Sequence, residues 1–242
     1  MARLGLDFPT DWARSAPARA VRRLVLSGIV VPFTKRATSL TVIGAENIPS
    51  SGAVIFTANH TSHMDTTLAL AAIPASRRQR TVVAAAADTF FMKRWIAALT
   101  CLMVNAIPIE RHKVNRRSAE KASELIAQGW SLLIYPEGGR TPTGPMLEFK
   151  GGAAFLAERT GATVVPTFIL GAGEWLSKYA KADMYLALPH RWRSPVTVAF
   201  GSPLTMAEDE NIRRFGPRIQ QAVVDLAREV TGDPTWGSHL YQ

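Results

Sequence analysis

The 242-residue sequence contains a single cysteine, Cys101, so it can form neither an intrachain disulfide nor a cysteine-rich zinc module. It also lacks a long apolar run. The best one, residues 95–109, is broken by Asn105 and Pro108, and it is shorter than the roughly 20 residues of a membrane-spanning helix. The first 18 residues have no apolar stretch typical of a signal peptide. We therefore expect neither a transmembrane helix nor a signal peptide.

Acidic residues are scarce relative to basic ones. The sequence has 19 Asp and Glu against 28 Lys and Arg, a formal net charge of +9. The excess is concentrated in residues 1–58 and 76–121. A basic surface favours a polyanionic partner: nucleic acid, an anionic membrane or a phosphorylated substrate. The basic residues show no strong aromatic interleaving and no nucleic-acid-binding motif, so we expect no nucleic-acid partner.

Short apolar segments alternate with segments of helical periodicity along the chain. The expected strands are residues 38–44, 54–57, 82–86, 106–109, 132–135, 164–169 and 196–200. The expected helices are residues 10–36, 65–73, 90–103, 115–128, 151–160 and 208–230, with 90–103 a buried helix. This alternation predicts an α/β fold with a mostly parallel sheet flanked by helices, preceded by a basic N-terminal helical segment over residues 1–37.

The N-terminal segment has the composition of a helix that lies in a membrane interface. Its apolar stretch, residues 24–33, is flanked by Trp12 and by the basic residues Arg14, Arg19, Arg22, Arg23, Lys35 and Arg36. Basic flanks around a short apolar segment favour an interfacial helix on an anionic membrane. The alternative is a solvated basic helix that packs on its own domain.

Three polar clusters directly follow expected strands, at residues 59–65, 110–111 and 137–140. Ligands of open parallel sheets bind outside the carboxyl ends of the strands. We therefore expect the three clusters to converge on one site.

The first cluster reads NHTSHMD over residues 59–65 and places His60 five residues before Asp65. This spacing suits a turn into a helix, in which Asp65 folds back onto the His60 ring. A carboxylate on one ring nitrogen fixes the tautomer and leaves the other nitrogen free to take a proton from a hydroxyl. No G-x-S-x-G elbow is present, so that hydroxyl could be the substrate's own. The alternatives are a structural hydrogen bond, a metal bound together with His63, and a Ser62 nucleophile.

The second cluster ends in Glu110 and Arg111, and arginine is suited to bidentate phosphate binding. The alternative is an exposed basic turn.

The third cluster reads YPEGGRT over residues 135–141. Gly138 and Gly139 allow the backbone to approach a ligand closely, and Arg140 supplies positive charge. Glu137 could orient Arg140 or bind a hydroxyl, and Lys150 stands near an expected helix N-terminus, which favours anions. The alternatives are a glycine-rich turn with a surface ion pair, and a solvated lysine.

The order of these clusters resembles the PlsC-like glycerolipid acyltransferase superfamily, which includes the 1-acylglycerol-3-phosphate (lysophosphatidic acid) acyltransferases. The family pattern of N-H-x-x-x-x-D (the HX4D motif), an Arg-ending strand motif, E-G-T-R and V-P-x reads here as NHTSHMD at 59–65, NAIPIER at 105–111, PEGGR at 136–140 and VPT at 165–167. GAENIP at 44–49 and FKGG at 149–152 also match, so the resemblance covers about residues 38–205. Asn105 replaces a frequent glycine and Gly139 replaces threonine, and we place both departures in acceptor-binding motifs.

The resemblance implies an O-acyltransferase domain over residues 38–242. The implied donor is acyl-CoA or an acyl carrier protein, and the implied acceptor is a lysophospholipid, above all 1-acylglycerol-3-phosphate, which would give phosphatidic acid. His60 would be the general base and Asp65 would orient it. The acceptor would be held by Arg111, Glu137, Gly138, Gly139, Arg140 and Lys150. Neither a bound cofactor nor a metal is implied.

Four further expectations complete this interpretation. The protein is expected on the cytoplasmic face of a membrane, peripheral or monotopic, with an anionic membrane surface as partner. Residues 90–103 and Trp130 are candidates for an acyl-chain groove, although plain core is the favoured interpretation for most of these positions. Cys101 is expected to be inert core. Another lysophospholipid or a glycolipid remains an alternative acceptor. The sequence also allows a non-catalytic binder of anionic membranes or a metal-dependent hydrolase.

Overall fold

The computed structural model describes residues 4–111, 116–141, 146–175 and 192–241. Its centre is a sheet of strands β1 (Thr38–Ile43), β2 (Val54–Ala58), β3 (Thr81–Ala86), β4 (Ala106–Ile109), β5 (Ser131–Ile134), β6 (Thr163–Leu170) and β7 (Ser194–Phe200). The strand order is β1-β7-β6-β2-β5-β3-β4. All neighbours are parallel except β6 and β7, which are antiparallel. The predicted α/β fold with a mostly parallel sheet is confirmed.

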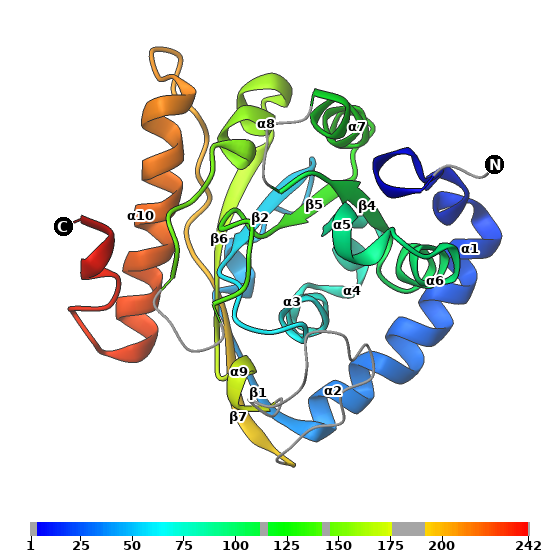
Figure 1. Cartoon of the computed structure of the whole chain (residues 1–242). Helices are drawn as coiled ribbons and strands as arrows, with labels where there is room; N and C mark the ends of the chain where they lie inside the picture. Colours follow the sequence, from blue (N-terminus) through cyan, green and yellow to red (C-terminus); the bar gives the residue numbers. More distant parts are fainter. Residues whose placement is uncertain (1–3, 112–115, 142–145, 176–191, 242) are drawn as a thin grey trace.

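Helices cover both faces of this sheet (Figure 1). They are α1 (Ala16–Arg22), η3 (Arg23–Val30), α2 (Val31–Ala37), α3 (Asp65–Ala72), α4 (Ala75–Arg78), α5 (Ala87–Phe90), α6 (Arg94–Val104), α7 (Arg116–Ala127), α8 (Gly152–Thr160), α9 (Ala172–Trp175) and α10 (Ile212–Thr231). Short 3₁₀ segments are η1 (Gly5–Asp7), η2 (Asp11–Arg14), η4 (Ala45–Asn47) and η5 (Ser238–Tyr241).

The alternation of side chains along β2 builds two cores. Phe56 packs in a cluster with Leu68 of α3, whereas the adjacent Ile55 packs in a separate cluster with residues of α7, α8 and α10. Because successive strand side chains point to opposite faces, a strand covered on both sides must be apolar throughout. All five residues of β2 are buried, which explains why the sequence reads there as a continuous apolar run.

The N-terminal helical segment packs against the rest of the chain. α1, η3 and α2 form a long continuous helix (Figure 1), in which η3 is a π-helical stretch. Arg22 is buried, and its guanidinium donates to the carbonyl oxygens of Ala13 (2.8 Å) and of Cys101 (3.3 Å) in α6. This arginine therefore joins the segment to the domain and does not belong to a membrane-facing basic flank. The division at residue 37 stays a prediction.

The prediction of a buried helix over residues 90–103 is wrong about burial. The segment is divided into α5 and α6, and Trp95 and Leu99 of α6 are 65% and 51% exposed. Only one side of α6, with Ala97 and Cys101, packs against the core. An apolar sequence with helical spacing does not distinguish a buried helix from one with an exposed apolar face.

Candidate active site

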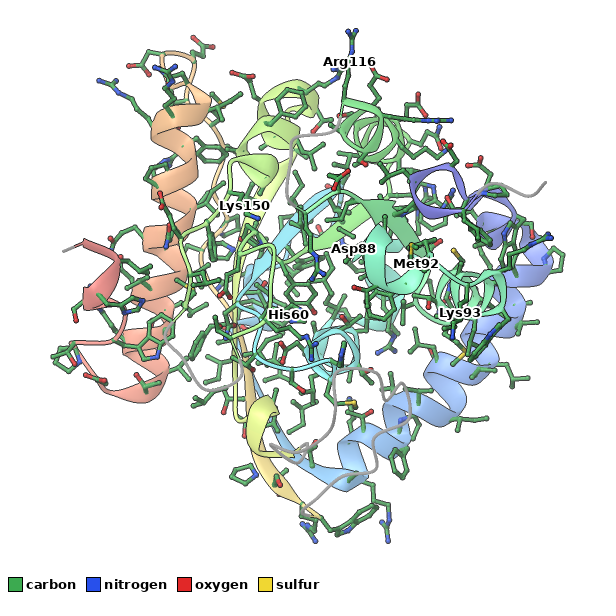
Figure 2. The ribbon with its side chains drawn as sticks, in the orientation of Figure 1. His60, Asp88, Met92, Lys93, Arg116 and Lys150 are labelled. Carbon is green, nitrogen blue, oxygen red and sulfur yellow. The ribbon has the colours of Figure 1, made fainter. Side chains whose placement is uncertain are left out.

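The three polar clusters lie at one edge of the sheet. β2, β4 and β5 run in the same direction, as the parallel pairings of β2 with β5, β5 with β3 and β3 with β4 require. His60, Arg111 and Glu137 each follow the carboxyl end of one of these strands within three residues. His60 and Lys150 both lie near the middle of the view in Figure 2. The convergence predicted from the sequence is present.

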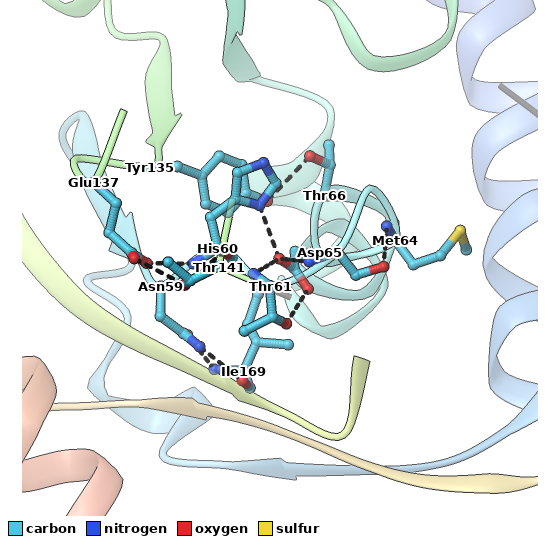
Figure 3. A network of polar contacts seen from close by, with 11 residues as sticks. Asn59, His60, Thr61, Met64, Asp65, Thr66, Tyr135, Glu137, Thr141 and Ile169 are labelled. Carbon is cyan, nitrogen blue, oxygen red and sulfur yellow. Dashed lines mark hydrogen bonds and ion pairs between the residues drawn. The ribbon is translucent and has the colours of Figure 1, made fainter. Parts of the chain in front are cut away.

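His60 and Asp65 form the contact that their spacing predicts (Figure 3). The Asp65 Oδ2 atom lies 2.8 Å from His60 Nδ1. The same oxygen accepts hydrogen bonds from the backbone N–H groups of Thr61 (2.7 Å) and Ser62 (2.8 Å). Asp65 is completely buried at the start of α3, whereas the His60 side chain is 18% exposed. With Nδ1 facing the carboxylate, Nε2 is the ring nitrogen left to exchange a proton with a ligand.

Tyr135 supports the other side of the imidazole. Its ring stacks on the His60 ring with 4.1 Å between centroids and 20° between planes. Its hydroxyl shares a 3.0 Å hydrogen bond with Thr66 of α3. Burial, together with the negative charge of Asp65, raises the pKa of Tyr135 well above its ordinary value, so the phenol stays neutral. The sequence places Tyr135 at the start of the third cluster, at the end of an expected strand, but indicates no role for it.

Glu137 holds the loop that contains His60 by hydrogen bonds to its carboxylate. Its Oε1 accepts a 2.7 Å hydrogen bond from the His60 backbone N–H, and its Oε2 accepts from the Leu147 N–H (2.8 Å) and the Thr141 hydroxyl (3.2 Å). The side chain is buried, and burial raises its pKa although these hydrogen bonds oppose the shift. Arg140 is not among its partners in the described chain, so the expectation that Glu137 orients Arg140 gains no support.

Two further contacts hold the same loop, and the sequence did not indicate either. The Thr141 backbone N–H donates to the His60 carbonyl at 2.9 Å. The Asn59 side chain accepts from the Ile169 N–H at 2.7 Å and donates to the Ile169 carbonyl at 2.9 Å. Asn59 is thus bound on both sides to β6, which fixes where the chain leaves β2.

Arg111, Gly138 and Lys150 meet beside the histidine loop. The Arg111 guanidinium forms an ion pair with Asp88 (2.9 Å). The backbone carbonyl of Arg111 accepts a 2.5 Å hydrogen bond from Lys150 Nζ. Gly138 has φ +70°, and a Cβ there would overlap the Lys150 ammonium. Glycine is therefore needed at 138 both for the backbone conformation and for the approach of Lys150.

Arg140 is the cation of this site without a described partner. It makes no hydrogen bond or ion pair within the part of the chain that the structure describes, and it is partly buried. Burial and the nearby charge of Arg111 lower the pKa of Arg140, while Asp65 opposes the shift. Two guanidinium groups thus lie near the His60–Asp65 pair, an arrangement that attracts an anion. Gly139 adds open space, since a Cβ there would have no other atom of the described residues within 4 Å.

The sequence-based placement of Asn105 is wrong. Asn105 caps α6 with φ +55°, and its side chain donates to the Thr81 carbonyl at 3.1 Å. It lies before β4, at the opposite end of that strand from Arg111, so it does not belong to an acceptor site. Its positive φ explains why glycine also suits this position. Trp130 also precedes β5, and it is buried there beneath Arg80, as its interpretation as a core residue predicts.

The alternative chemistries gain no support from the described residues. Among them, no group of three or more His, Cys, Asp and Glu side chains is arranged to hold a metal ion. The His63 ring packs edge-on against Phe90, and the Ser62 hydroxyl accepts from the Met64 N–H at 3.2 Å. None of the helices in the described segments combines the length and the apolar character that crossing a membrane requires.

Known proteins resemble this chain in sequence. A 1-acyl-sn-glycerol-3-phosphate acyltransferase of Chlamydomonas reinhardtii is 31% identical over 180 residues, which cover 72% of this chain and 49% of that protein. A chloroplastic enzyme of the same name from Arabidopsis thaliana is 27% identical over 164 residues, 64% of this chain and 41% of that protein. The chain thus spans about half the length of the curated relatives it matches.

A solved structure has the same fold. The crystal structure of the 1-acyl-sn-glycerophosphate (LPA) acyltransferase PlsC from Thermotoga maritima superimposes with a TM-score of 0.59 at 23% sequence identity. The match covers 90% of this chain and 87% of that one. The family model described as Acyltransferase matches residues 39–170, more than half of the sequence and a stretch that contains His60, Asp65, Arg111 and Arg140. The chain therefore belongs to the acyltransferase family.

Proposed function

We propose that this chain is an acyltransferase that moves a fatty acyl group from a thioester to a hydroxyl of 1-acylglycerol-3-phosphate, giving phosphatidic acid. The donor in this proposal is acyl-CoA or an acyl carrier protein, and no bound cofactor takes part. The names of the relatives from Chlamydomonas reinhardtii and Arabidopsis thaliana support the acceptor.

The observation that carries the proposal is the His60–Asp65 pair. The 2.8 Å contact at Nδ1 orients the ring, and Tyr135 fixes its plane by stacking. The partly exposed imidazole at the carboxyl edge of the sheet can then receive an acceptor hydroxyl at Nε2.

In the proposed reaction, His60 Nε2 takes the hydroxyl proton while the hydroxyl oxygen attacks the thioester carbonyl carbon. A C–O bond forms, and the C–S bond breaks as the tetrahedral intermediate collapses. The imidazolium then returns the proton to the departing thiolate, which leaves as a free thiol. Asp65 stabilises the imidazolium between these two transfers.

The cationic half of the site supports a phosphorylated acceptor. Arg140 has no described partner, Arg111 lies close enough to influence its pKa, and Lys150 is hydrogen-bonded to the Arg111 carbonyl. In the proposal these three cations bind the acceptor phosphate, and the Gly138-Gly139 backbone leaves room for its glycerol.

The proposed setting is the cytoplasmic face of an anionic membrane, with the chain bound peripherally or monotopically. Support comes from exposed apolar side chains on the N-terminal helix and α6: Val21, Leu24, Ile29, Phe33, Trp95 and Leu99. α6 packs beside α1 and η3, so these side chains belong to neighbouring helices. Basic residues on the same helices, such as Arg19 and Arg94, would meet anionic headgroups.

The test is thiol release from a long-chain acyl-CoA or an acyl carrier protein, in vesicles with and without 1-acylglycerol-3-phosphate. We expect acceptor-dependent release and formation of phosphatidic acid. His60→Ala is expected to reduce the rate by about 10²–10⁴-fold. His63→Ala is the matched control, because it removes a histidine from the same loop. The ring of His63 packs on Phe90 and not on Asp65.

Acceptor-dependent release that persists in His60→Ala would remove His60 from its role. Vesicle binding without release for any lysophospholipid or donor would favour a non-catalytic membrane-binding protein.

A second candidate is the same transfer to another lysophospholipid or a glycolipid. The observation that favours it is the open space beside Gly139, where the family pattern has threonine. The same assay run with a panel of lysolipids distinguishes the two candidates by their kcat/KM values.

A further inference from the structure

A cavity of about 470 Å³ lies between the start of the N-terminal helix and α4. Its lining residues are Ala16, Arg19, Ala20, Arg23, Ser76, Gln79 and Arg80. Three of the seven side chains are guanidinium groups and none is acidic. Guanidinium groups are positively charged at neutral pH and match the geometry of phosphate oxygens, so the cavity is suited to an anion.

The helix places two of the arginines together. Arg19 and Arg23 are four residues apart across the junction of α1 and η3, and therefore share one face of the helix. Both are exposed, and neither side chain makes a hydrogen bond or ion pair in the described part of the chain. Two cations on one face with no neutralising partner repel each other, and a bound anion would relieve that repulsion.

The third arginine and the walls of the cavity are fixed by other contacts. The Arg80 guanidinium lies 5.4 Å from the centroid of the Trp130 ring and donates to the Gln128 carbonyl at 3.1 Å. Gln79, just after α4, donates to the Ser27 hydroxyl of η3 at 3.0 Å. These contacts hold the helix and the α4 end at a set separation, so the cavity is a formed feature of the fold.

This cavity is distinct from the site around His60. Arg80 directly precedes β3, at the amino end of the strand. The site around His60 lies at the other edge of the sheet, at the carboxyl ends of the parallel strands. β3 has six residues, and at about 3.3 Å per residue it separates the two edges by roughly 20 Å. Leu24, which is 70% exposed, lies four residues after Ala20 of the cavity lining and so shares its side of the helix. The cavity therefore borders the apolar side chains through which a membrane would be contacted.

We propose that this cavity is a second binding site, for a phosphate monoester or diester group that Arg19, Arg23 and Arg80 hold together. Such a group is carried by the headgroup of an anionic phospholipid and also occurs as free phosphate. The site requires binding only, so it does not depend on the proposed acyl transfer.

The test compares two charge-matched double variants. Arg19→Gln with Arg23→Gln removes the two unpartnered cations of the cavity and keeps Arg80, which packs on Trp130. Arg213→Gln with Arg214→Gln removes two exposed arginines from α10, on the other side of the molecule (Figure 1). Binding is measured by flotation with phosphatidylcholine vesicles with and without phosphatidic acid, and by calorimetric titration with inorganic phosphate. Circular dichroism and thermal unfolding check that both variants fold.

We expect the double variant of the cavity, Arg19→Gln with Arg23→Gln, to bind phosphatidic acid vesicles about tenfold more weakly than wild type. The double variant of α10 should bind them less than about twofold more weakly. Loss of vesicle binding, with or without loss of phosphate binding, identifies a lipid headgroup as the source. Loss of phosphate binding alone identifies a free phosphate compound. Equal losses of binding in the two double variants would show that the effect comes from net charge alone, and would overturn the proposal. Unchanged binding in a folded Arg19→Gln, Arg23→Gln variant would overturn it as well.

Discussion

Glu137 accepts a 2.7 Å hydrogen bond from the backbone N–H of His60, although the two residues are 77 positions apart. The contact joins the loop after β5 to the loop after β2 at the carboxyl edge of the sheet. It acts on the backbone of the histidine, whereas Asp65 acts on its ring. The position of the imidazole therefore depends on two buried carboxylates with separate tasks.

The first prediction concerns Glu137→Gln. The amide group would turn a donor toward the His60 or the Leu147 N–H, each of which now donates to a carboxylate oxygen. A buried donor left without an acceptor costs about 1–3 kcal/mol. We expect urea unfolding to show a loss of this size, together with a reduced kcat. Glu148→Gln is the control, because Glu148 is exposed. Equal stability of the two variants would show that the hydrogen bonds to the Glu137 carboxylate do not stabilise the fold.

The second prediction is a pH dependence of stability that comes from the same carboxyl group. Burial raises the pKa of Glu137 above its ordinary value of 4.5. The folded protein then retains the proton at pH values where the unfolded chain has lost it. The contribution of Glu137 to the free energy of unfolding is therefore complete below pH 4.5 and decreases as the pH rises from there through the raised pKa.

The measurement is a series of urea unfolding curves from pH 4 upward for the wild type and Glu137→Gln. The difference in unfolding free energy between the two proteins should shrink as the pH rises. A difference that grows with pH would mean that the hydrogen bonds to Glu137 outweigh its burial.

The strands were predictable because burial on both faces leaves a continuous apolar run in the sequence. Residues 54–57 and 106–109 were expected as strands, and β2 and β4 occupy Val54–Ala58 and Ala106–Ile109. The antiparallel pairing of β6 with β7 was not predicted. Strand direction depends on how the chain returns to the sheet, and periodicity within a strand carries no information about that.

The candidate site could likewise be predicted only in part from the sequence. The His60–Asp65 contact is local, so a spacing of five residues was enough to predict it. Tyr135 and Thr141 lie more than 70 positions from His60 and reach it only through the parallel alignment of β2 with β5. Asn105 was misplaced because a helix cap and a ligand-binding residue look alike in a short motif. Only the structure shows at which end of the strand such a residue lies.

The third prediction separates the ring of Tyr135 from its hydroxyl. Tyr135→Phe keeps the stacking on His60 and removes only the 3.0 Å contact with Thr66. Tyr135→Leu removes the stacking surface itself. We expect kcat within about fivefold of wild type for Phe, because one neutral hydrogen bond contributes about 1 kcal/mol. For Leu we expect a loss of at least tenfold with an unchanged KM for the acyl donor. Equal kcat values in folded Phe and Leu variants would show that the stacking does not position His60.

The fourth prediction concerns the reactivity of Cys101. The thiol is buried in α6, and burial raises its pKa to about 12. Only the thiolate reacts with alkylating agents, so the native protein should resist iodoacetamide at pH 8 and react at the rate of unfolding. The readout is mass-spectrometric labelling across a urea series. Fast labelling in the absence of urea would show that α6 opens locally, and would contradict its firm packing against Ala97 and Ala106.

The fifth prediction compares two adjacent glycines. Gly138→Ala places a Cβ against Lys150 and keeps a backbone φ of +70°, which costs a residue with a side chain about 1–2 kcal/mol. Gly139→Ala meets no atom of the described segments within 4 Å, at a φ that alanine tolerates, so its stability should stay within about 1 kcal/mol of wild type. The displaced Lys150 should raise the KM for a phosphorylated acceptor in Gly138→Ala but not the KM for the acyl donor. Thermal unfolding and acceptor titrations measure the two effects separately. A rise in acceptor KM in Gly139→Ala alone would place the acceptor against Gly139 and away from Lys150, so the lysine would lose its role in phosphate binding.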